Sequence, residues 1–131
     1  MQRIHVHHSQ YTGPWPWSSF LPSEVSCRHC GELCLDPGEF SPSLSMDALQ
    51  LLRDTWGRPI TINSGHRCFF HNHAVGGTTN SQHLKLAFDC ACPKDEQARF
   101  VKAARNAGFT GIGMYRTFVH LDLGPKREWR G

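Results

Sequence analysis

Three side chains in the second half of the chain have the chemistry of metal ligands: His83, Asp89 and His120. Asp89 lies within an alternating apolar run, where burial of an unpaired carboxylate would be costly. His120 lies between apolar residues of a closing strand, so it either lines a cleft or occupies the exposed face of an edge strand. Two imidazole nitrogens and one carboxylate oxygen, with a fourth position open to water, form a known ligand set for catalytic zinc. Zinc in such a site lowers the pKa of its water to roughly 7 and polarises a carbonyl group.

Six cysteines and nine histidines are a second indication of metal or disulfide chemistry. The Cys-x-x-Cys spacing suits one edge of a structural zinc site, and disulfide pairing is the competing interpretation. The candidates for this site are Cys27, Cys30 and Cys34, with Cys68 or His29. Cys90 and Cys92 share a strand face with Phe88, so we expect them to be buried free thiols.

Hydrophobic periodicity predicts the elements that position these residues. We expect a helix over 46–56 with Ser45 as its N-cap, and a helix over 94–107 with Ala98 inside that stops at Gly108. Short strands are expected over 59–63, 84–91, 111–115 and 118–123. This order of elements predicts an α+β fold, with a small antiparallel sheet packed by two or three helices.

Length and composition indicate a single globular domain of 131 residues, 39% of them hydrophobic. The Pro- and Trp-rich residues 1–26 predict an extended N-terminal arm, and residues 27–131 the domain itself. No apolar run approaches the roughly 18 residues of a membrane span, and the N-terminus lacks the apolar stretch of a signal peptide. The 14 Lys and Arg are spread along the chain, which argues against a nucleic-acid binder. We expect a monomer made in the cytoplasm.

Several motifs resemble the zinc D-Ala-D-Ala carboxypeptidase family, which is related to the hedgehog signalling domain. The chain is most similar to its small bacterial and phage murein peptidases, from about residue 20 to the C-terminus. The motifs read Ser64-Gly65-His66-Arg67-Cys68, His71-Asn72-His73-Ala74-Val75-Gly76-Gly77, Ser81-Gln82-His83-Leu84, Ala87-Phe88-Asp89, Gly111-Ile112-Gly113-Met114-Tyr115, Phe118-Val119-His120-Leu121-Asp122-Leu123-Gly124-Pro125 and Trp129.

The resemblance implies a hedgehog/D,D-peptidase-like fold in which His83, Asp89 and His120 hold one catalytic zinc ion. It also implies that Arg67 binds a substrate carboxylate or stabilises the oxyanion, the alternative being a structural arginine that pins its loop. Ser81 is expected to order the substrate-binding loop before His83 and not to act as a nucleophile. Tyr115 is expected either to help bind the oxyanion or to pack in the core.

Two departures from the family pattern bear on activity. The family usually has seven steps from histidine to aspartate with an intervening glycine, whereas His83 and Asp89 are six apart without one. Several members place a carboxylate three residues before the last ligand, where this chain has Thr117. Asp122 is the nearest carboxylate on the strand face of His120, so we expect it to be the general base or to orient the histidine.

Together these features predict a zinc metallopeptidase that hydrolyses peptidoglycan stem peptides or crosslinks, as a D,D-carboxypeptidase or an endopeptidase. The missing leader suggests a phage or prophage lysis protein acting at the cell wall. The alternative is a zinc-binding module of the same fold without hydrolysis, which Thr117 and the short His83 to Asp89 spacing favour. A second, structural zinc ion would occupy the cysteine site.

Overall fold

The computed structural model describes residues 15–27, 42–65 and 86–131. Its elements, in chain order, are α1 (Pro22–Val25), α2 (Pro42–Trp56), β1 (Ile62–Ser64), β2 (Phe88–Ala91), the 3-10 turn η2 (Lys94–Glu96), α4 (Gln97–Ala107), β3 (Gly111–Met114), β4 (Phe118–Asp122) and β5 (Arg127–Arg130). No helix in these ranges is long and apolar enough to cross a membrane.

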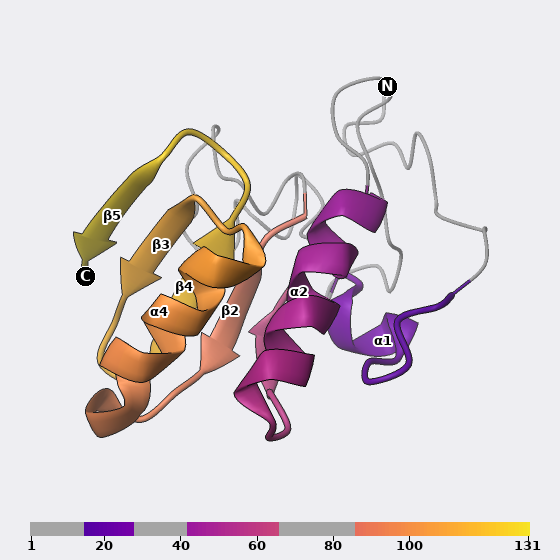
Figure 1. Cartoon of the computed structure of the whole chain (residues 1–131), viewed down its shortest axis with the longest axis horizontal. Helices are drawn as coiled ribbons and strands as arrows, with labels where there is room; N and C mark the ends of the chain where they lie inside the picture. The colour runs from indigo at the N-terminus through magenta and orange to yellow at the C-terminus, as the bar shows by residue number, and fades with distance from the viewer. Residues whose placement is uncertain (1–14, 28–41, 66–85) are drawn as a thin grey trace, which may run out of the picture.

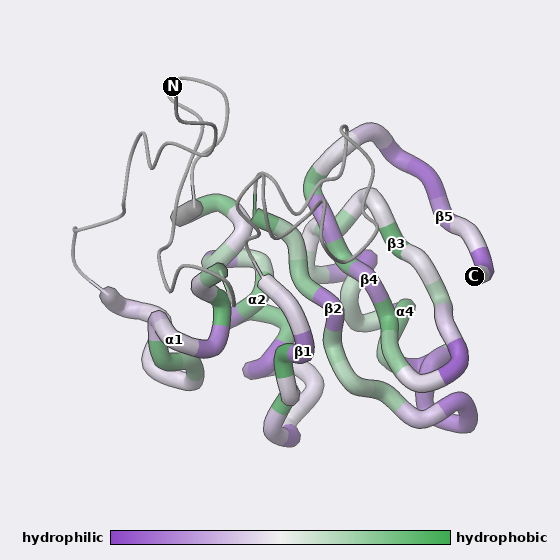
Figure 2. Tube along the Cα trace, turned by 180° about the vertical axis from the view of Figure 1, so that it is seen from behind, coloured by the Kyte–Doolittle hydropathy of each residue, from purple (hydrophilic) through white to green (hydrophobic). Residues whose placement is uncertain are grey.

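The strands form one sheet in the order β1-β2-β4-β3-β5. The pairs β1·β2, β2·β4 and β3·β4 are antiparallel, and β5 joins β3 in parallel at the edge. Helices α2 and α4 cover one face of the sheet, and the view from behind shows the strands in front of them (Figures 1 and 2). The predicted α+β class is therefore confirmed, with one parallel edge pair added to the antiparallel sheet.

The core lies between the helices and the covered face of the sheet. Along β2, Phe88 and Cys90 are fully buried, whereas Asp89 and Ala91 point to the other face. The same alternation in β4 buries Val119 and Leu121 in the core. Period-two alternation therefore presents the polar residues of β2 and β4 on the face of the sheet that the helices do not cover.

The starts of both predicted helices and one buried position differ from the prediction. The helix predicted over 94–107 is α-helical only from Gln97, because Lys94–Glu96 form the 3-10 turn η2. α2 begins at Pro42, so Ser45 lies inside the helix, where its hydroxyl donates to the Leu86 carbonyl at 3.3 Å instead of capping. In α4 the buried face runs through Gln97, Phe100, Val101 and Ala104, while Ala98 is exposed. The predicted stop is confirmed, because Gly108 ends α4 with a φ of 110°.

The stretch before α1 packs against α2. Trp17 is 4% exposed and its indole N–H donates to Asp47 at 2.8 Å. The indole N–H of Trp15 donates to the Phe20 carbonyl at 2.7 Å. Residues 15–20 therefore contribute apolar side chains to the same core as the sheet and the helices.

Candidate metal centre

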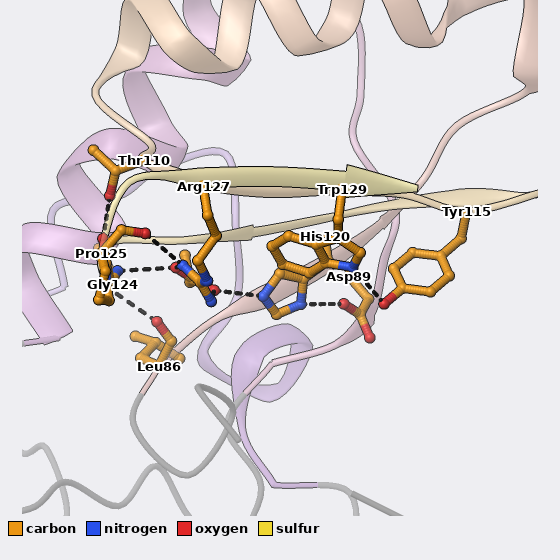
Figure 3. Close-up of polar contacts among 11 residues, drawn as sticks. Leu86, Asp89, Thr110, Tyr115, His120, Gly124, Pro125, Arg127 and Trp129 are labelled. Atoms are coloured by element: carbon orange, nitrogen blue, oxygen red, sulfur yellow. Dashed lines mark hydrogen bonds and ion pairs between the residues drawn. The ribbon is translucent and has the colours of Figure 1, made fainter. Parts of the chain in front are cut away.

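Asp89 and His120 meet because β2 and β4 are paired in a register that sets them directly opposite each other. The Nδ1 atom of His120 lies 3.0 Å from Oδ1 of Asp89 (Figure 3). The side chain of His120 is 11% exposed and that of Asp89 is 18% exposed. β4 lies between β2 and β3 in the sheet, so the interpretation of His120 as a residue on an edge strand is wrong.

Asp122 holds the other ring nitrogen of His120. Its Oδ2 lies 2.7 Å from Nε2 of His120, and its side chain is 1% exposed. Both carboxylate oxygens accept from the guanidinium of Arg127 at 2.8 Å, and the backbone N–H of Gly124 donates to Oδ1 at 2.9 Å (Figure 3). This carboxylate is thus saturated with donors, which is how a buried charge is compensated.

The contacts shift both pKa values. Burial raises the pKa of Asp122, but hydrogen bonds from His120, Arg127 and Gly124 outweigh it, and the net pKa lies far below the usual range. Burial lowers the pKa of His120, and its hydrogen bonds with Asp122 and Asp89 reverse this, so the net pKa is raised. Asp122 is therefore a permanent anion behind the imidazole.

The donor set fits a zinc ion. When Nε2 of His120 carries its proton toward Asp122, the lone pair of Nδ1 faces Asp89. Ligand atoms around a tetrahedral zinc ion lie roughly 3.3 Å apart, from metal–ligand distances of about 2.0 Å. The observed distance of 3.0 Å between Nδ1 of His120 and Oδ1 of Asp89 is close to this ligand-to-ligand distance. A carboxylate that receives the second N–H of a ligand histidine is the usual support of such sites.

Tyr115 and Trp129 line the site next to His120. The Trp129 ring centroid lies 5.4 Å from that of His120, and its indole N–H donates to the Tyr115 hydroxyl at 2.9 Å (Figure 3). An indole N–H can only donate, so the phenol oxygen accepts this bond and keeps its own proton to donate elsewhere. The Tyr115 ring stacks on Phe118, with centroids 4.6 Å apart.

A glycine makes room for the indole. Gly113 pairs with Trp129 in the β3·β5 register and with His120 in the β3·β4 register. A Cβ at Gly113 would lie 2.5 Å from the Trp129 ring. The absence of a side chain here therefore lets the indole lie against the sheet beside the histidine.

Sequence reasoning missed β5 and with it the role of Arg127. The strand is four residues long and carries three charges, so it lacks the apolar run by which strands are recognised. One signal was available in the sequence: Arg127 and Trp129 are two residues apart, so in an extended strand they share one face.

The remaining predicted site residues fall into two groups. Seven of them lie outside the described residues: His29, Cys30, Cys34, Arg67, Cys68, Ser81 and His83. Within the described ranges no group of three His, Cys, Asp or Glu side chains is placed to hold a metal ion. Cys27 is buried, and Cys90 and Cys92 are buried free thiols, as predicted for the last two.

Two comparisons match the chain to known proteins. A model of the peptidase M15 family matches residues 19–122. The zinc D-Ala-D-Ala carboxypeptidase of Streptomyces albus G is 34% identical over 93 residues, which cover 66% of this chain and 36% of the relative. The chain thus spans little more than a third of the length of that relative.

Proposed function

The chain belongs to the peptidase M15 family, and from this premise we propose that it is a zinc peptidase acting on the peptides of bacterial peptidoglycan. Its reaction adds water across a peptide bond of a stem peptide or crosslink and releases a carboxylate and an amine. A bond next to D-alanine is supported by the similarity to the zinc D-Ala-D-Ala carboxypeptidase of Streptomyces albus G.

The observation that carries the proposal is the pairing of Asp89 with Nδ1 of His120, backed by Asp122 on Nε2. Asp89 and His120 would hold the zinc ion, with His83 as the third ligand. When bound, zinc supplies a Lewis acid that polarises the scissile carbonyl and lowers the pKa of water. The protein holds the ligands in register through the β2·β4 ladder.

Asp122 has two predicted roles, and its contacts favour the orienting one. Its carboxylate already accepts from His120, Arg127 and Gly124, and its pKa lies far below the range of a useful base. We therefore assign Asp122 to fixing the tautomer and the ring orientation of His120.

The other side chains would act on the substrate. Tyr115 keeps a phenolic proton that can be donated to the carbonyl oxygen as negative charge develops on it. Arg67 would bind a carboxylate end or share the oxyanion, and Ser81 would order the substrate side of the loop before His83. The proposed substrate lies in the cell wall, so the protein would act there, and phage lysis is one such setting.

Cleavage of purified muropeptides, followed by mass spectrometry with zinc present, tests the proposal. We expect new products from the wild type. We expect His120→Ala and Asp89→Ala to lose more than the roughly 10- to 100-fold typical of outer-shell substitutions. Asp54→Asn, an exposed carboxylate on α2, is the matched control and should retain activity. No product from the wild type, or equal product from His120→Ala, would overturn the proposal.

A zinc-binding module without hydrolysis is the second candidate. It is favoured by Thr117 at the position where several relatives carry a carboxylate, together with the saturated contacts of Asp122. Stoichiometric zinc that is lost in His120→Ala, without turnover of any muropeptide, would decide for this candidate.

A further inference from the structure

A pocket of about 690 Å³ opens where β2 ends and the turn between β3 and β4 passes beside it. Its walls are mainly apolar, and they carry two cations. The lining residues are Ala91, Cys92, Pro93, Lys94, Arg116 and Thr117. We propose that this pocket is a substrate subsite for a free carboxylate on the peptide, an inference that rests on the proposed peptidase function.

The pocket and the candidate metal centre share strand β2, because Ala91, which lines the pocket, points to the same face of the sheet as Asp89. Ala91 follows Asp89 by two residues and pairs with Phe118, just as Asp89 pairs with His120. Two residues of extended strand span about 7 Å, which is also the length of two residues of an extended peptide. A substrate whose scissile bond lies at the Asp89–His120 pair can therefore reach the pocket about two residues away.

Two unneutralised cations give the pocket its selectivity. Lys94 and Arg116 are exposed, and neither takes part in an ion pair of the described residues. Two acids, Asp95 and Glu96, follow Lys94 in the chain. Glu96 is held by Arg58 in a bidentate pair at 3.1 Å, which leaves Asp95 as the one of these two that opposes the cations. Figure 2 shows the hydrophilic segments after β2 and between β3 and β4 side by side at one end of the sheet.

The rim of the pocket is preformed. The Cys92 N–H donates to the Thr117 carbonyl at 3.0 Å, which ties the end of β2 to the turn. The buried amide of Gln97 donates to the Cys92 carbonyl at 3.0 Å and to the Tyr115 carbonyl at 2.7 Å. The two cations therefore project from a rim that does not have to be ordered on binding, which favours affinity.

The neutral side chain of Thr117 also suits a carboxylate ligand in this pocket. A carboxylate at this position would neutralise one of the two cations and would repel an acidic ligand. Thr117 offers a hydroxyl donor instead. A carboxylate in the pocket would be met by an ammonium group, a guanidinium and a hydroxyl group, with apolar walls for the carbon chain that carries it.

Matched peptides test the subsite. Each free carboxylate of a cleavable peptide is converted in turn to the carboxamide, and KM and kcat are measured for the wild type and for Lys94→Gln/Arg116→Gln. We expect one carboxylate whose amidation raises the wild-type KM about tenfold with little change in kcat, as for loss of a charged hydrogen bond. For the double variant, the KM of the unmodified peptide should be raised by the same factor. Amidation of that carboxylate should then raise the KM of the double variant no further.

Lys102→Gln, an exposed lysine on α4 beneath the other face of the sheet, is the control for net charge and should leave KM unchanged. The subsite proposal is overturned if the double variant has the KM of the wild type on the unmodified peptide. It is also overturned if the KM of the double variant rises equally on every amide. Calorimetric titration of the same peptides separates the two levels of inference. If the protein binds the free carboxylate selectively but cleaves no peptide, the peptidase proposal fails and the subsite proposal stands. If it cleaves the peptides but amidation leaves KM unchanged, the peptidase proposal stands and the subsite proposal fails.

Discussion

At the scale of single residues, the centre depends on a relay that runs from Arg127 through Asp122 to His120. The guanidinium holds both oxygens of a carboxylate that is 1% exposed, and that carboxylate holds Nε2 of the imidazole. A neutral imidazole carries a proton on only one of its two nitrogens. Because Asp122 accepts the proton of Nε2, Nδ1 is left with a lone pair that faces Asp89. Metal affinity and stability should therefore respond together when Arg127 changes.

Arg127→Met should lower the free energy of unfolding by about 2 kcal/mol, measured by urea denaturation. Loss of a partner from a buried pair costs about 3–5 kcal/mol, and the 36% exposure of Arg127 reduces this. Zinc affinity should also fall about tenfold, as for other groups that support a ligand histidine. Arg130→Met, an exposed arginine three residues along β5, should change neither quantity. Equal behaviour of the two variants would contradict the relay.

The Cys92 thiol gives a second residue-scale prediction. Burial, with the nearby charge of Glu96, raises the pKa of Cys92 from 9.0 to about 11. At pH 8 the folded protein should react with iodoacetamide at Cys92 roughly 100-fold more slowly than the unfolded chain, because the thiolate is the nucleophile. Peptide mapping by mass spectrometry measures the two rates, and equal rates would exclude the raised pKa.

The same pKa shift has a consequence for stability. Below pH 9 the thiol is protonated in both states, so Cys92 adds no pH dependence. Between pH 9 and 11 the unfolded chain loses this proton first, and the free energy of unfolding should fall over that window.

At the scale of elements, β5 is what completes the site. It adds Arg127 and Trp129 to one face of the sheet and pairs Glu128 with Arg105 of α4 on the other, at 2.6 Å. The parallel pairing of β5 with β3 sets the indole of Trp129 against Gly113. In this position the indole N–H donates a hydrogen bond to the Tyr115 hydroxyl. The close approach of Gly113 to Trp129 makes this arrangement testable by a double-mutant cycle.

Gly113→Ala should destabilise the protein by about 1–3 kcal/mol in urea denaturation, as overpacking does, because its Cβ would lie 2.5 Å from the indole. In a Trp129→Ala background the same substitution should cost much less, since the clashing ring is gone. Additive effects of the two changes would show that the clash is not the cause.

The elements also show what sequence reasoning can and cannot reach. Alternation along residues 86–91 identified the outward face of Asp89, and Gly108 marked the end of α4, because these signals are local. The start of α2 was placed four residues late, since buried Ser45 resembles a cap in sequence. The relay through Arg127 depends on a parallel edge pairing, which no local pattern encodes. The ligand set and the family came from motif resemblance rather than from periodicity.

At the scale of the whole molecule, binding of zinc to the folded state alone should stabilise it. With free zinc at 100 times its dissociation constant, the free energy of unfolding should rise by about 2.7 kcal/mol over the chelated protein. Denaturation with and without a chelator measures the gain. His120→Ala should remove the part due to this centre, and any gain that it retains reports a separate site such as the proposed cysteine site. An undiminished gain in His120→Ala would contradict zinc binding at this centre.

The most direct test of the account is a crystal of the zinc-loaded protein with diffraction data collected on both sides of the zinc absorption edge. We predict an anomalous peak about 2.0–2.2 Å from Nδ1 of His120 and from a carboxylate oxygen of Asp89, with Nε2 still bonded to Asp122. A zinc-loaded crystal with no peak between these two side chains, or with the metal on Nε2, would contradict it.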